Sequence, residues 1–178
     1  FNMCADDVCA AGARDGKHHC IAELNDFTYT ADNEVIYNCY TNLYKAIEVC
    51  NRFLNDYYDF DGGWKYLAKD GVVSSEHNNP DRYQAEIRVL RVWLHFTLAT
   101  GWYNPPLVTT YPTPTNLKNT PYADILKWCL SELEICFDPL ASRNGQSDKD
   151  GAYFVRQGFA RALWGKILLF NNIVKLVY

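Results

Sequence analysis

The chain has 178 residues and a formal net charge of -4, and 48% of its residues are hydrophobic, as is typical of a folded globular protein. No apolar run reaches the roughly 18 residues that a membrane-spanning helix needs, since Asn171, Asn172 and Lys175 interrupt the longest one. The negative net charge gives no electrostatic reason to expect a nucleic-acid partner.

The first 33 residues have a mixed composition of small residues, glycines, paired acids and paired histidines, which predicts loops and at most a short helix. From Glu34 the hydrophobic residues recur at helical spacing, which predicts a helix over about 33–57 with Asp32 or Asn33 as its N-cap. The glycine pair in DFDGGW, residues 59–64, predicts a turn. A short helix is expected within residues 65–80.

A second long helix is predicted over about 81–100, starting at Asp81 and ending at Gly101. The proline-rich stretch 102–119 cannot form a regular helix and is expected to be extended around PPLVTTY. A third helix is predicted over about 120–137, with Thr120 as N-cap and Pro121 as its first residue.

A polar loop over 142–151 and a fourth helix over about 153–172 complete the prediction. The chain is therefore expected to be all-α. Helix pairs of this length suggest a tetratricopeptide-like helical repeat scaffold with long loops, while a helix bundle stays open as the alternative. We expect one domain over 1–178, with a loop-rich segment at 1–33 and helical repeats over 34–178.

The seven cysteines form an odd set, so no disulfide scheme pairs them all. Cys39 and Cys50 fall in one predicted helix, and Cys129 and Cys136 fall in another, at separations of roughly 10 Å or more along the helix axis. Most of the cysteines are therefore predicted to be free thiols that act as small apolar core residues.

Glu86, Arg88 and Arg91 are the charged residues of the 81–100 helix that invite a functional reading. Glycoside hydrolysis needs two carboxylates that converge on one bond, and this helix supplies one. We expect these charges to pair with neighbouring helices and to fix the stack of repeats.

Metal sites are the weaker alternatives. Asp6 and Asp7 with the His18-His19-Cys20 run have neither the i, i+4 histidine pair nor a CxxC motif. The Asp59–Trp64 stretch alternates oxygen ligands but has no complete calcium loop with a closing glutamate. No metal and no cofactor is predicted.

Aromatic residues are abundant, with 13 Tyr, 5 Trp and 9 Phe. Tyr and Trp combine a flat apolar ring with a polar group, which suits wet interfaces and the C–H faces of sugar rings. Several lie in predicted loops, where binding residues are often placed by a rigid scaffold. These are Phe27, Tyr29, Trp64, Tyr66, Trp102, Tyr103 and Tyr111. Packing of these rings beneath the repeats is the alternative.

The stretch AEIRVLRVWLHFTLATGWYNPPLVTT, residues 85–110, resembles the signature of the SusD/RagB-like outer-membrane nutrient-binding lipoproteins of Bacteroidota. The matching residues are Ala85, Glu86, Arg88, Leu90, Arg91, Phe96, Leu98, Pro106, Leu107 and Val108. TPYADILKWCLSELEICFDPL at 120–140 and GAYFVRQGFARALWGKILLF at 151–170 are similar to two later helices of that family. The cysteines and Tyr103-Asn104 depart from the family pattern.

The resemblance implies a fragment covering the N-terminal to central part of such a protein, without its lipidated cysteine or its C-terminal half. It also implies that glycan contacts come partly from N-terminal loops. The candidate ligand-binding residues are therefore Arg14, Asn25, Phe27 and Tyr29, followed by Trp64 and Tyr66.

The implied function is non-catalytic capture of an oligosaccharide by a surface-exposed lipoprotein of the outer membrane, held to the membrane through a lipid anchor absent from this chain. The implied partner is a SusC-like TonB-dependent transporter, which receives the ligand. A peptide-binding member of the family, an α-helical glycoside hydrolase and a helical-repeat protein-interaction scaffold are the alternatives.

Overall fold

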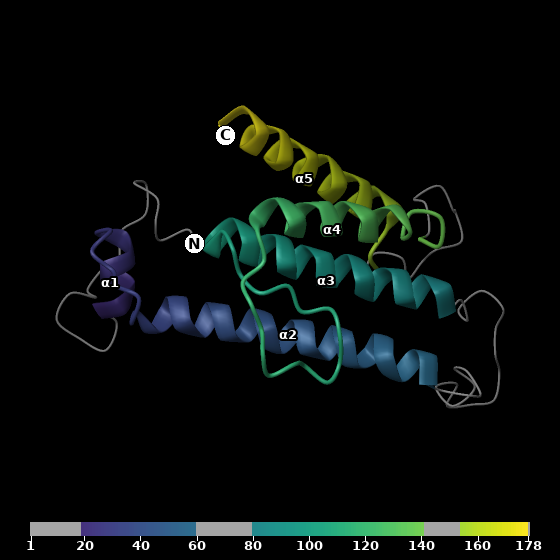
Figure 1. Ribbon diagram of the computed structural model, residues 1–178, viewed down its shortest axis with the longest axis horizontal. Helices are drawn as coiled ribbons and strands as arrows, with labels where there is room; N and C mark the ends of the chain where they lie inside the picture. Colours follow the sequence, from purple (N-terminus) through teal and green to yellow (C-terminus); the bar gives the residue numbers. More distant parts are fainter. Residues whose placement is uncertain (1–18, 60–79, 141–153, 178) are drawn as a thin grey trace. The chain divides into compact units, whose positions relative to one another are not determined.

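The computed structural model describes residues 19–59, 80–140 and 154–177 (Figure 1). Within these ranges every regular element is an α-helix, which confirms the predicted all-α class. The helices are α1 (His19–Asn25), α2 (Glu34–Asp59), α3 (Pro80–Trp102), α4 (Tyr122–Glu134) and α5 (Gln157–Val177). None of them, over the described residues, is long and apolar enough to cross a membrane.

The chain divides into two compact units, Phe1–Lys45 and Ala46–Tyr178, and the boundary falls inside α2. The predicted single domain, with its division after residue 33, stays a prediction. The predicted turn at 60–64, the short helix within 65–79 and the polar loop at 142–151 lie outside the described residues, as do Cys4 and Cys9.

Asn33 organises the first unit. Its Oδ1 accepts hydrogen bonds from the backbone N–H of Val35 at 3.1 Å and of Ile36 at 3.3 Å, so it caps the N-terminus of α2 as the sequence predicts. Its Nδ2 donates to the carbonyl oxygen of Cys20 and to Glu23 Oε2, both at 2.8 Å. One buried amide therefore ties α1 to the start of α2.

The second unit has its core between α3, α4 and α5, which follow one another in antiparallel order (Figure 1). The residues that α3 contributes to this core recur at i, i+4, i+7, i+11 and i+14, which places them on one face of the helix. They are Ala85, Val89, Val92, Phe96 and Ala99, and they pack with Ile125, Leu126, Cys129, Leu133, Ala160, Leu163 and Ile167 of the other two helices. Burial of this apolar face against α4 and α5 holds the three helices together.

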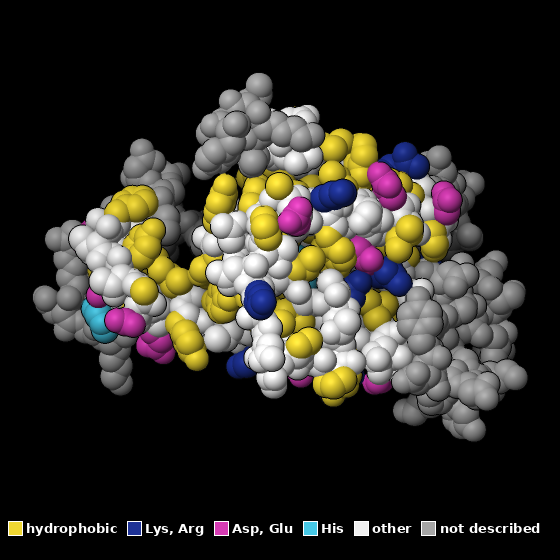
Figure 2. All heavy atoms as spheres, in the orientation of Figure 1, with side chains coloured by type: hydrophobic (Ala, Val, Ile, Leu, Met, Phe, Trp, Pro, Cys, Tyr) yellow, Lys and Arg dark blue, Asp and Glu magenta, His cyan; other side chains and the backbone are white. Residues whose placement is uncertain are grey.

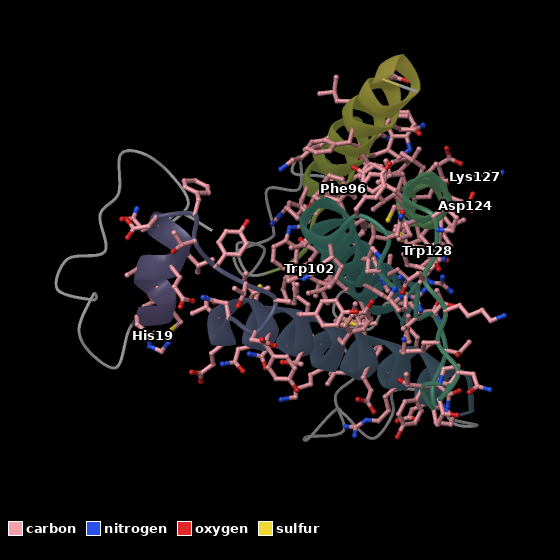
Figure 3. All side chains as sticks on the ribbon, turned by 60° about the vertical axis from the view of Figure 1, so that its left-hand side comes forward. His19, Phe96, Trp102, Asp124, Lys127 and Trp128 are labelled. Carbon is pink, nitrogen blue, oxygen red and sulfur yellow. The ribbon has the colours of Figure 1, made fainter. Side chains whose placement is uncertain are left out.

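Individual side chains follow this layering. Phe96 lies between α3 and α5, where its ring meets Phe170 edge-on at a centroid distance of 5.3 Å (Figure 3). Trp128 points from α4 toward α3, whereas Asp124 and Lys127 on the same helix are exposed. On the face that Figure 2 shows, basic and acidic side chains of the described residues are interspersed.

The helix α4 begins at Tyr122 and ends at Glu134 instead of spanning 120–137. Thr120 is not its N-cap: no side chain of the preceding residues 120–121 caps it, and Pro121 holds the cap position. The first helical N–H, that of Tyr122, donates to Asn104 Oδ1 at 2.8 Å, while the hydroxyl of Thr120 accepts from Leu107 N–H at 3.2 Å. Asn104, which lies in the preceding loop, therefore accepts a hydrogen bond at the start of α4, where the sequence predicts the Thr120 side chain as the cap.

The end of α3 also differs from the prediction. Gly101 is helical, the helix continues to Trp102, and Tyr103 adopts the positive φ of 64° that glycine usually takes after a helix. The PPLVTTY stretch is not helical, as expected, and it has bends at Thr110 and Tyr111. α5 begins at Gln157, later than predicted, and runs to Val177.

The described cysteines Cys20, Cys39, Cys50, Cys129 and Cys136 are free, as predicted. Cys50, Cys129 and Cys136 are buried, which fits the expected role of small apolar core residues. Cys136 lies two residues beyond α4, and its thiol donates to the carbonyl oxygen of Glu132 at 3.0 Å.

Candidate functional site

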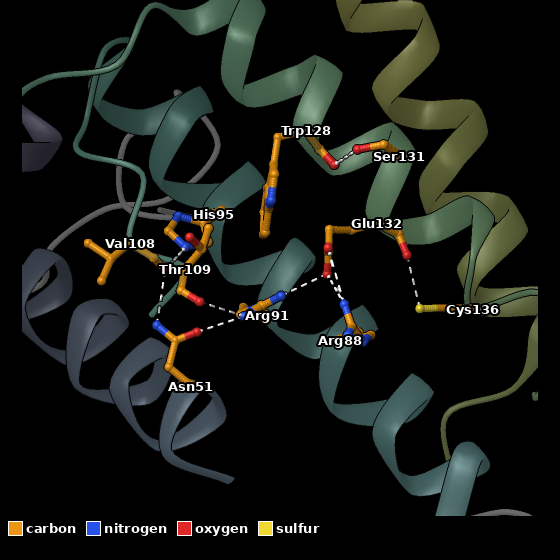
Figure 4. A network of polar contacts seen from close by, with 10 residues as sticks. All are labelled: Asn51, Arg88, Arg91, His95, Val108, Thr109, Trp128, Ser131, Glu132 and Cys136. Atoms are coloured by element: carbon orange, nitrogen blue, oxygen red, sulfur yellow. Dashed lines mark hydrogen bonds and ion pairs between the residues drawn. The ribbon is translucent and has the colours of Figure 1, made fainter. Parts of the chain in front are cut away.

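A buried polar network joins α2, α3, α4 and the loop after α3 (Figure 4). Its centre is Arg91, which is 5% exposed. Arg91 Nη1 donates to Asn51 Oδ1 at 2.8 Å and to the carbonyl oxygen of Thr109 at 3.2 Å. Arg91 Nη2 donates to Glu132 Oε2 at 2.7 Å, so one guanidinium connects two helices and the loop to α3.

Glu132 accepts from a second arginine. Arg88 Nη1 lies 2.9 Å from Glu132 Oε2 and 3.2 Å from Oε1. A carboxylate with two close guanidinium groups is strongly compensated, which permits its burial between helices. Arg91 also lies over the ring of Trp128, 5.4 Å from the ring centroid, which adds a cation–π contact.

His95 extends the network to the loop. Its Nε2 lies 2.9 Å from the carbonyl oxygen of Val108, which also accepts from Asn51 Nδ2 at 3.0 Å. Burial is the largest cause that lowers the pKa of His95 to about 4, and the positive charge of Arg91 lowers it further. The imidazole is therefore neutral at pH 7, with Nε2–H as the donor to Val108.

The network is a structural clamp. Among the ten residues of Figure 4, Glu132 is the one carboxylate, and its lone pairs are engaged by arginines. The interhelical pairing predicted for Arg88 and Arg91 is confirmed. For Glu86 that prediction is wrong, because its carboxylate pairs with Arg82 one turn earlier on the same helix, at 2.9 Å.

The predicted ligand-binding residues that the structure describes lie at the end of α1 and in the turn that follows it. Asn25 is the last residue of α1, Phe27 is 64% exposed with a φ of 55°, and Tyr29 is 44% exposed. The N–H groups of Asp26 and Thr28 donate to the carbonyl oxygens of Ala22 and Glu23, both at 2.9 Å. The turn that carries the two rings is therefore anchored to α1. Arg14, Trp64 and Tyr66 lie outside the described residues.

The metal alternatives gain no support in the part of the chain that the structure describes. No group of three or more His, Cys, Asp or Glu side chains there is placed to hold an ion. His19 is exposed on α1, and Asp59 is the last residue of α2. Asp6, Asp7, His18 and Asp61 lie outside the described residues.

Sequence reasoning missed Asn51, His95 and Glu132 as members of the network. Each is an ordinary helix residue in the sequence, and its partner is 13 to 57 positions away. The Arg88 and Arg91 charges, set among the apolar residues of the middle of α3, were the one local signal. They indicated that a buried partner exists without indicating which residue it is.

No protein-family model and no curated protein matches the chain. Among solved structures, a SusD-like carbohydrate-binding protein from Bacteroides fragilis NCTC 9343 is 29% identical over 87% of this chain and 28% of its own, with a TM-score of 0.63.

Two further solved structures have the same fold. A laminarin-binding SusD-like protein is 20% identical over 85% of this chain and 30% of its own, with a TM-score of 0.67. Surface glycan-binding protein A from Bacteroides uniformis is 19% identical over 86% of this chain and 32% of its own, with a TM-score of 0.66. The described helices thus have the tetratricopeptide-like fold of these proteins. The chain is similar to a fragment of a SusD-like protein and spans less than a third of the length of the solved structures compared.

Proposed function

We propose that the protein captures an oligosaccharide at the bacterial cell surface without transforming it. The observation that carries this proposal is the 29% identity, over 87% of the chain, to a SusD-like protein described as carbohydrate-binding. The laminarin-binding and surface glycan-binding proteins of the same fold add support.

The turn after α1 supplies groups of the chemistry that glycan capture needs. A sugar ring stacks its C–H face on an aromatic plane, while amides bind its hydroxyl groups. Phe27 and Tyr29 are exposed rings, and Asn25 stands two residues before Phe27. We assign these three residues to ligand contacts, and we propose Arg14, Trp64 and Tyr66 as further residues that contact the ligand.

Delivery of the ligand is the second part of the proposal. The captured glycan passes to a SusC-like TonB-dependent transporter, and a lipid anchor holds the protein at the outer membrane. The similarity to SusD-like proteins supports this arrangement. Co-purification of a large outer-membrane transporter with the protein from its native membranes is the expected result, and recovery of the protein without such a partner would count against it.

The test of capture is isothermal titration of the full protein, as its gene encodes it, against laminarin and a panel of other soluble glycans. One glycan class is expected to bind, and Phe27→Ala or Tyr29→Ala is expected to weaken that binding about tenfold, since a lost ring contact is worth on the order of 1 kcal/mol. Tyr37→Ala is the matched control, because Tyr37 is 62% exposed on the regular helix α2.

Three outcomes would redirect the proposal. Release of reducing sugar from the glycan that binds would favour the glycoside hydrolase. Failure of every glycan, with binding of peptides instead, would favour the peptide-binding alternative. Failure of both ligand classes would leave the protein-interaction scaffold.

A further inference from the structure

The turn between α1 and α2, residues 26–32, is closed by backbone hydrogen bonds at both ends; we call it the aromatic turn (Figure 1). At its start, the N–H of Thr28 donates to the carbonyl oxygen of Glu23 on α1 at 2.9 Å. At its end, the N–H of Asn33 donates to the carbonyl oxygen of Thr30 at 3.1 Å. The backbone of the turn is therefore tied to α1 on one side and to the first residue before α2 on the other.

The Asn33 side chain joins these two ends. Its Nδ2 donates to Glu23 Oε2 and to the carbonyl oxygen of Cys20, both at 2.8 Å. Its Oδ1 accepts from the N–H groups of Val35 and Ile36. Both donors and both lone pairs of the amide are thus engaged, and Asn33 is 3% exposed. Asn33 therefore acts on the turn from beneath and does not offer a group to a ligand.

Phe27 occupies the most constrained position of the aromatic turn. The helix α1 ends at Asn25. The bond from Thr28 to Glu23 is therefore the six-to-one bond of a Schellman cap, which places Phe27 at the C′ position. Its φ of 55° lies in the left-handed region that glycine favours there. Residues in such conformations concentrate at binding sites, where surrounding contacts hold them.

The order of the turn matters because of what it carries. Phe27 is 64% exposed and Tyr29 is 44% exposed, while Asn33 is buried. Rings on a loose loop would have to be immobilised when a ligand binds, which costs conformational entropy. A turn that is closed before the ligand arrives avoids much of this cost.

We propose that Asn33 and Glu23 are positioning residues of the glycan site, because their hydrogen bond holds the aromatic turn in its binding conformation before a sugar arrives. This inference rests on the proposed function and deepens it, since it assigns the order of the site to two residues that are not ligand contacts. The ligand it implies is an oligosaccharide that stacks on a preformed aromatic surface.

Two substitutions of Glu23 in the full protein test the hydrogen bond to Asn33. Glu23→Ala removes the acceptor and does not weaken α1, since alanine is the best helix former. Glu23→Gln is the matched control, because it removes the same charge but keeps an oxygen that can accept from Asn33. Titration uses laminarin first, then the panel glycan that the unchanged protein binds. The affinity is expected to be about fivefold lower for Glu23→Ala and within about twofold for Glu23→Gln.

Hydrogen exchange measured by mass spectrometry separates positioning from a general loss of stability. In ligand-free Glu23→Ala, the peptide that covers the aromatic turn is expected to exchange faster, while peptides from α3, α4 and α5 exchange as in the unchanged protein. Saturation with the glycan is expected to slow exchange in the turn again. Faster exchange along the whole chain would overturn the positioning role.

The remaining outcomes also decide. Unchanged exchange of the turn in Glu23→Ala overturns the inference, as does faster exchange with unchanged glycan affinity, and the proposed function stands in both cases. Equal weakening by Glu23→Gln assigns the effect to charge and overturns it too. Absence of glycan binding by the unchanged protein overturns both proposals. Asn33→Ser keeps an N-cap oxygen but has no amide donors, so it is expected to bind more weakly than Glu23→Ala; if it does not fold, the Glu23 variants decide.

Discussion

His95 shows how a single residue couples loop position to pH. The side chain is wholly buried, with 0% exposure, and its Nε2 donates to the carbonyl oxygen of Val108. Protonation would place a second positive charge near Arg91 in a site where water cannot solvate it. The loop after α3 is therefore anchored by an imidazole that must remain neutral.

Unfolding is expected to become easier between pH 6.5 and pH 4 because of His95. The pKa of His95 is lowered to about 4 in the folded state from the ordinary value of 6.5, so the unfolded chain binds the proton first as the pH falls. The lost free energy of unfolding is roughly 2–3 kcal/mol by pH 4.5, at 1.36 kcal/mol for each pH unit of the shift. Urea unfolding at pH 7 and pH 4.5 measures it.

A comparison of variants separates the effect of His95 protonation on the free energy of unfolding from the effect of carboxylate protonation. His95→Gln keeps an N–H donor but does not titrate, so its stability is expected to fall less between the two pH values. His19→Gln, at an exposed position of α1, is expected to behave as the unchanged protein does. Equal losses in the His95→Gln variant and the unchanged protein would contradict the assignment.

At the scale of helices, Glu132 is the link between α3 and α4. It is the carboxylate that faces both Arg88 and Arg91, with side-chain exposures of 16% for Glu132 and 6% for Arg91. Apolar burial brings the helices together without fixing their register, whereas these directional contacts specify which turns face each other. The clamp thus fixes the register of α3 and α4, which the apolar core alone holds together.

Glu132→Ala is expected to lower the free energy of unfolding by about 3 kcal/mol, because it leaves the buried Arg91 charge without its carboxylate. Glu134→Ala, at an exposed position of the same helix, is expected to change it by about 0.5 kcal/mol or less. Urea unfolding monitored by circular dichroism gives both values. Similar losses in the two variants would show that the clamp contributes little.

The helices themselves were predictable because apolar periodicity extends over many residues, and α2 differs from its prediction by a few residues at its ends. The starts and ends of α4 and α5 were less predictable, as was the backbone conformation directly after α3. Asn104 caps α4 from 18 positions away, and Tyr103 takes a glycine conformation, so neither follows from local preference. Of the candidate site, the exposure of Phe27 and Tyr29 agrees with a loop position, while their ligand stays a prediction.

At the scale of the whole molecule, burial divides the five cysteines that the structure describes into two groups. Burial is the largest cause that raises the pKa of the Cys50 and Cys129 thiols, and it raises that of Cys136 to about 12. Cys20 and Cys39 are half-buried. Because the thiolate is the reactive form, the first three residues should be inert in the folded protein.

Brief labelling of the native protein with N-ethylmaleimide at pH 7.5 is expected to modify Cys20 and Cys39 well before Cys129 and Cys136. Peptide mass spectrometry identifies the sites, and the same reaction in concentrated urea should modify all of them. Labelling of Cys129 as fast as Cys39 in the native protein would show that the α3–α4–α5 core opens readily.

The shared oxygen of Glu132 also constrains how this sequence can change. Because Arg88 and Arg91 both reach Oε2, the effect of replacing either arginine depends on whether the other is present. An aspartate, one methylene shorter, cannot serve both guanidinium groups without movement of a helix. Substitutions of Arg88, Arg91 and Glu132 should therefore be tolerated when they occur together and not one at a time. The three residues are expected to change together in evolution.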